Sequence, residues 1–218
     1  MFGLPSLEKI IYTLPAFVIA ISCHEFAHAW VANQYGDPTA KNHGRLTLNP
    51  LAHFDLFGFL LFIVVGLGWA KGVPVNSYNF KGNRRVAMIA VSLAGVTVNF
   101  ILAILALIIQ CLLVLGVHSG IVALEIATPA ITIFYLIFTY NVMFGVFNLL
   151  PIPPLDGSKV LAALLPGEFE DKIAAVDRFG FFILLGLLWI GWLNKVLWPL
   201  IDKVSDGIYG VIVPIFFR

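Results

Sequence analysis

Long stretches of apolar sequence constrain the fold of this chain more than any other feature. An α-helix needs roughly 20 apolar residues to cross the hydrocarbon core of a bilayer, which is about 30 Å thick. Four runs reach that length, at 10–32, 86–117, 121–150 and 179–201, and a shorter run lies at 56–70. Hydrophobic residues make up 60% of the 218 residues and charged residues 11%, which is far more apolar than an ordinary soluble domain. The sequence predicts an all-α polytopic membrane protein with about four to six membrane segments.

Basic residues indicate how these segments are oriented. They gather in three polar stretches, 33–55, 71–85 and 155–178, as Lys41, Arg45, Lys71, Lys81, Arg84, Arg85, Lys159, Lys172 and Arg178. The turn at 116–120 has no lysine or arginine. Because cytoplasmic loops carry an excess of lysine and arginine, all three stretches are predicted to lie on the cytoplasmic side. The protein itself is expected in the plasma membrane of the cell. The run at 56–70 must then dip into the membrane and return.

The flanks of the 56–70 run favour a short re-entrant or strand-like element between the first and second full spans. "RLTLNP" at 45–50 and "GVPVNSYNF" at 72–80 alternate as short strands do, and Gly58, Gly66 and Gly68 interrupt the run itself. Non-helical backbone at membrane depth is tolerated only against protein or a water-filled cavity. We therefore expect a hydrated cavity nearby.

The polar stretches are too short to bury a core of their own. We expect one membrane-embedded domain over 1–218, with a core at 10–165 and a C-terminal helix and tail at 179–218. The tail at 202–218 is broken by glycines and a proline, so it either lies on the membrane surface or dips into it a second time. A net charge of +1 favours membrane lipid and no nucleic acid as a partner.

The motif "HEFAH" places charged and imidazole groups inside the first apolar run. Such groups are costly to bury in a membrane, so they mark a functional site by default. Residues four apart share one face of a helix, so His24 and His28 can hold one metal ion, with Glu25 beside it. This H-E-x-x-H arrangement is typical of zinc hydrolases, in which a glutamate takes a proton from water that the metal has activated. Buried polar bonding or a structural metal site is the alternative reading.

A catalytic zinc ion takes three protein ligands and keeps one position open. Candidates for the third ligand, inside or beside apolar runs, are His53, Asp55, His118, Glu125 and Asp156. The two residues near the re-entrant run favour backbone hydrogen bonds, His118 a solvated turn and Glu125 a helix start.

Asp156 differs from the other candidates in its setting. It ends "FNLLPIPPLD", in which three prolines cannot continue the preceding helix. A carboxylate therefore stops near the cytoplasmic end of that helix, at the depth expected for His24 and His28.

Two motifs together carry a family resemblance. "HEFAH" followed by "NLLPIPPLDG" resembles the site-2 protease family of intramembrane zinc metalloproteases, and "SLAGVTVN" at 92–99 is similar to its small bacterial and archaeal members without a PDZ domain. Val96 stands where the family usually has proline, and Gly72 and Ser77 also replace common prolines. These departures concern helix and loop geometry and touch no expected ligand.

The resemblance implies a zinc metalloendopeptidase that cleaves transmembrane proteins within or near the bilayer. It implies one Zn²⁺ per chain held by His24, His28 and Asp156, with Glu25 as general base. Asn148 is implied to support the oxyanion or the substrate backbone. The active site should lie nearer the cytoplasmic face. A non-proteolytic membrane metal carrier or chaperone that retains the fold is the alternative.

The middle apolar run carries an asparagine and several small residues that need an explanation. Asn99 favours an interhelical hydrogen bond over a role in positioning substrate. Ser92, Ala94 and Gly95 read as small residues that let two helices approach closely, without a part in the chemistry.

Overall fold

The computed structural model describes residues 6–65, 68–166, 173 and 175–217 of the chain. Within these residues the protein is helical and has no strand. The longer helices are α1 (Leu7–Gln34), α3 (Leu56–Val65), α4 (Arg84–His118), α5 (Leu124–Leu149), α6 (Asp156–Leu164), α8 (Gly180–Trp189) and α9 (Trp198–Phe216). Short helical turns are α2 (Thr39–Asn42), η1 (Pro50–His53), η2 (Ser77–Asn79) and η3 (Leu193–Leu197).

Three helices form the centre of the molecule. Helices α1, α4 and α5 contain 28, 35 and 26 residues, so each is longer than the roughly 30 Å that a span requires. Among the described residues, these three are long and apolar enough to cross a membrane. They pack on one another through small side chains such as Ala20 and Ala103, which are fully buried, and through aromatic rings such as Phe17 and Phe138.

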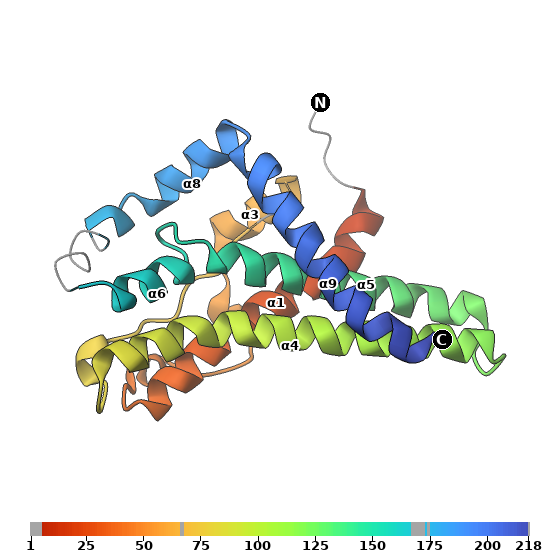
Figure 1. The fold of residues 1–218 in the computed structure, drawn as a ribbon, viewed down its shortest axis with the longest axis horizontal. Coiled ribbons are helices and arrows are strands. Elements are labelled where there is room, and N and C mark those ends of the chain that lie inside the picture. The colour runs from red at the N-terminus through yellow and green to blue at the C-terminus, as the bar shows by residue number, and fades with distance from the viewer. Residues whose placement is uncertain (1–5, 66–67, 167–172, 174, 218) are drawn as a thin grey trace.

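The ends of these helices agree with the orientation inferred from the basic residues. Figure 1 shows the C-terminal end of α1, the N-terminal end of α4 and helix α6 at one end of the molecule, with the α4–α5 turn at the other end. The side-chain oxygen of Asn83 caps α4 by accepting from the backbone N–H groups of Arg85 and Val86. The described parts of the three basic stretches therefore share an end, opposite the turn at 116–120.

The two ends of the 56–70 run lie side by side, because the backbone N–H of Lys71 donates to the carbonyl of His53 over 2.9 Å. Its first part is helix α3, and residues 66–67 lie outside the described residues. The expected strand character of the flanks 45–50 and 72–80 is wrong. No neighbouring strand supplies a ladder there among the described residues, and backbone N–H groups bond to side chains instead, as at Asn49 and Asn76. The dip into the membrane remains a prediction.

The run at 179–201 does not form the single crossing helix that we expected. Helix α8 has 10 residues, a length of about 15 Å, and the chain then turns at Gly191, whose φ is 71°. That backbone conformation suits glycine because it has no Cβ. The chain continues as α9, which crosses the bundle (Figure 1) and packs against α4 and α5. The expected tail at 202–218 is therefore mostly helix, with one face on the core.

Candidate metal centre

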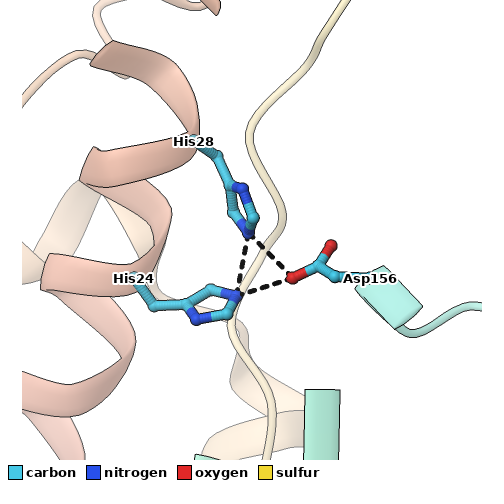
Figure 2. A group of neighbouring side chains, drawn as sticks. All are labelled: His24, His28 and Asp156. Atoms are coloured by element: carbon cyan, nitrogen blue, oxygen red, sulfur yellow. Dashed lines mark hydrogen bonds and ion pairs between the residues drawn. The ribbon is translucent and has the colours of Figure 1, made fainter. Parts of the chain in front are cut away.

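Three side chains from two distant parts of the chain converge (Figure 2). His24 and His28 project from consecutive turns of α1 toward Asp156, the first residue of α6. Oδ2 of Asp156 lies 3.0 Å from Nε2 of His24 and 2.9 Å from Nε2 of His28, and the two Nε2 atoms are 2.9 Å apart. All three side chains are buried. The third candidate ligand thus joins the two histidines, as predicted.

The proline-rich segment explains how Asp156 reaches this place. Helix α5 ends at Leu149 and the chain passes through "PIPP" before α6 begins. Proline lacks an N–H and cannot extend the helix, so the chain turns within these few residues. The carboxylate then sits at the N-terminal end of α6, where the helix dipole favours a negative charge.

The second polar atom of each of these side chains is also engaged. Nδ1 of His28 donates to the backbone carbonyl of Val91 over 2.7 Å, and Nδ1 of His24 lies 2.7 Å from Oδ1 of Asn99. The Lys159 ammonium donates to Oδ1 of Asp156 over 3.1 Å.

This arrangement fits a zinc ion. A carbonyl oxygen can only accept, so Nδ1 of His28 carries the proton, and in the neutral ring Nε2 presents a lone pair. With His24 in the same state, two nitrogen lone pairs and a carboxylate oxygen face one another at 2.9–3.0 Å. Acceptor atoms this close repel one another unless a cation lies between them. Tetrahedral ligands of zinc are separated by about 3.3 Å, so the set needs to open by only a few tenths of an ångström.

A close helix contact fixes the position of the His24 ring. A Cβ atom on Gly95 of α4 would lie 2.5 Å from Cε1 and 2.6 Å from Nδ1 of His24. Only glycine leaves room for the ring there. Gly95 was expected to let two helices approach closely, and what it accommodates in the structure is the ring of a candidate metal ligand.

A cavity of about 630 Å³ opens beside the three side chains. Glu25 and Asn148 both line it, together with apolar residues such as Met88, Phe147 and Leu185. Oε2 of Glu25 accepts from the backbone N–H of Val73 over 2.7 Å. Nδ2 of Asn148 donates to the Phe144 carbonyl of its own helix over 3.0 Å. The glutamate and the asparagine thus face the same space as His24, His28 and Asp156. A cavity lies beside the 56–70 run as expected, and its hydration stays a prediction.

The other candidate ligands lie apart from the cluster. Nε2 of His53 bonds to the Thr47 carbonyl, and Oδ1 of Asp55 accepts from the N–H of Gly58 over 2.8 Å at the start of α3. His118 is the exposed last residue of α4, and Glu125 is in the first turn of α5. These positions agree with the roles that the sequence favoured.

Sequence reasoning missed the residues that hold the ligands in place. The Val91 carbonyl has no side-chain signal at all. Lys159 follows Asp156 by one helical turn, a spacing at which opposite charges meet, so it was open to detection. Asn99 was expected to bond between helices, and it does so through the Ala20 carbonyl and Asn141, but its contact with the His24 ring was not foreseen.

Comparison with known proteins decides the family. The model of peptidase family M50 matches residues 12–187. This chain belongs to peptidase family M50, the site-2 protease family. The M50 match includes every residue of the cluster and the cavity wall as far as Leu185.

Curated relatives agree with the M50 assignment. The chain is 38% identical over 211 residues to "Putative zinc metalloprotease YwhC" of Bacillus subtilis, covering 96% of this chain and 94% of that protein. It is 30% identical over 205 residues to "Putative zinc metalloprotease Rip2" of Mycolicibacterium smegmatis, covering 90% and 73%. "Zinc metalloprotease MJ0392" of Methanocaldococcus jannaschii is 24% identical over 182 residues, covering 80% and 42%. No solved structure matches the chain significantly. The chain is thus a membrane member of a zinc metalloprotease family.

Proposed function

We propose that this M50 chain is an intramembrane zinc metalloendopeptidase that hydrolyses peptide bonds of transmembrane proteins within or beside the bilayer. The observation that carries the proposal is the meeting of His24, His28 and Asp156, which are 132 residues apart at the extremes, on the wall of a cavity that Glu25 also lines. His24, His28 and Asp156 are the proposed ligands of one zinc ion. Glu25 is the proposed general base.

Each group of the site has a part in hydrolysis. When bound, zinc supplies Lewis acidity, which lowers the pKa of a water molecule toward about 7 and polarises a carbonyl group. The Glu25 carboxylate accepts the proton of the attacking water and passes it to the leaving amine. Its position is restrained by the Val73 N–H group on Oε2. Asn148 lines the same cavity and is proposed to donate to the oxyanion or the substrate backbone after its amide turns away from the Phe144 carbonyl.

The substrate is proposed to bind as an extended chain, because the carbonyl groups of a helix are occupied by their own hydrogen bonds. Residues 72–76 lie outside any helix, and Gly72, Val73 and Val75 line the cavity. An unwound substrate segment can pair with such backbone by edge addition. Replacing Gly72–Val75 with a flexible linker, and keeping Asn76, should abolish cleavage and leave zinc bound. Retained cleavage would refute this binding mode.

The proposed location is the plasma membrane, with the zinc site nearer the cytoplasmic face. The support is the shared end of the three basic stretches, which also holds the C-terminal end of α1 and helix α6 (Figure 1). Accessibility labelling of single cysteines at Lys41 and Ser119 in intact cells measures this orientation. Labelling of position 41 from outside the cell would reverse it.

The decisive test of the function is Glu25→Gln. A protease should keep its zinc and lose cleavage of a membrane-anchored reporter, because the amide cannot accept the proton. Glu125→Gln, at the opposite end of the bundle, is the matched control and should cleave normally. A metal carrier or chaperone would lose little on Glu25→Gln, so wild-type zinc content combined with unchanged function in that variant would refute the protease.

A further inference from the structure

Two fully buried asparagines lie behind the three proposed zinc ligands, where unpaired polar groups are costly. Asn99 of α4 and Asn141 of α5 each have 0% exposed surface. They connect the three spanning helices, because Asn99 contacts His24 and the Ala20 carbonyl of α1 as well as Asn141. Buried polar networks of this kind are tolerated when every member is paired.

Backbone carbonyls at both ends set the direction of this network. Nδ2 of Asn141 donates to the Ile137 carbonyl over 2.8 Å, which leaves Oδ1 of Asn141 to accept. Nδ2 of Asn99 donates to that oxygen over 2.9 Å and to the Ala20 carbonyl over 3.1 Å. Carbonyl groups cannot donate, so turning either amide round would set oxygen against oxygen.

The orientation of Asn99 decides the state of His24. With both Nδ2 hydrogens used, Asn99 presents Oδ1 to Nδ1 of His24 at 2.7 Å. An amide oxygen only accepts, so Nδ1 of His24 carries the proton and Nε2 presents its lone pair to Asp156 and His28. His28 achieves the same result through the Val91 carbonyl, which no side-chain substitution removes. His24 alone depends on a replaceable side chain.

We propose that Asn99, oriented by Asn141, is a positioning residue for metal binding: it holds the His24 ring with the proton on Nδ1 and so directs Nε2 at the zinc ion. The inference rests on the proposed zinc site. Partners that orient a histidine ligand in this way commonly change metal affinity by about 10–100-fold when they are removed.

The test measures the zinc dissociation constant of the full chain in detergent by competition with a chromophoric chelator. Asn99→Leu removes the acceptor for His24 and should weaken zinc binding by about 10–100-fold. Asn99→Asp loses the same two interhelical donations but keeps an oxygen for Nδ1, so it should bind zinc more tightly than Asn99→Leu. Asn141→Leu should have a smaller effect, because the Ala20 carbonyl still orients Asn99. Thr97→Val, on an exposed face of α4, is the matched control.

The comparison separates positioning from helix packing. If Asn99 only joined helices, Asn99→Asp would bind zinc no better than Asn99→Leu, and that result would overturn the proposal. So would a folded Asn99→Leu variant that binds zinc within twofold of wild type. If Asn99→Leu does not fold, Asn99→Ser replaces it, since a serine hydroxyl is too short to reach His24. If instead the His24→Ala variant binds zinc as tightly as wild type does, the proposed zinc site itself is refuted.

Discussion

Gly95→Ala tests whether the His24 ring is held in a fixed position. The added Cβ would lie 2.5 Å from Cε1 of His24, and ordinary contact begins at 3.4 Å, so the ring must move by 0.9 Å (3.4 − 2.5). The ring cannot move freely, because Asn99 and Asp156 hold its two nitrogens. Zinc–ligand distances vary by only about 0.2 Å, so a movement of this size disrupts the proposed zinc geometry.

A misplacement of about 1 Å in a catalytic site costs about 100-fold in rate, or roughly 2.7 kcal/mol of transition-state stabilisation. We expect Gly95→Ala to lower kcat/KM for a membrane-anchored reporter by at least that factor and to lower zinc content. Alanine favours a helix by about 1 kcal/mol over glycine, so lost helix stability would not explain the result. Gly116→Ala, on the same helix with its nearest contact at 3.4 Å, is the control. Activity of Gly95→Ala equal to that control would show that the ring is free to shift, and the reasoning would fail.

The remaining predictions concern the loop, the carboxylate and the metal. Although burial favours the neutral acid, hydrogen bonds from Thr39, Asn79 and Asn76 lower the pKa of Asp37; the stability from this group is therefore present above about pH 4 and is lost as the pH falls below that value. The melting temperature of wild type should exceed that of Asp37→Asn at pH 7, and the gap should shrink toward pH 3; a constant gap would contradict this. Lys159→Met removes the ammonium from Asp156 and should weaken zinc binding about tenfold in a chelator competition, with unchanged affinity as the contrary result. Incubation with a chelator should stop cleavage and added zinc should restore it, as assayed with the reporter; cleavage by the metal-free protein would refute a zinc enzyme.

Much of the architecture could be read from the sequence because it depends on local patterns. The runs at 10–32, 86–117 and 121–150 became α1, α4 and α5, since an apolar run of sufficient length can satisfy its backbone only as a helix in a membrane. The run at 179–201 failed this reasoning, because a single glycine, Gly191, was enough to turn the chain. The 72–80 flank failed because alternation predicts a strand only where another strand can pair with it.

The chemistry was legible for a related reason. "HEFAH" lies on one helix, so its spacing alone predicts that His24 and His28 share a face, and "LDG" after three prolines marks a carboxylate just beyond the end of a helix. The tertiary structure decided how far apart the two motifs lie and which atoms face inward. Gly95 beside the ring, the Val91 carbonyl behind His28 and the two asparagines behind His24 come from other helices. Their roles depend on contacts of about 3 Å between atoms of three packed helices. No pattern within one segment carries that information.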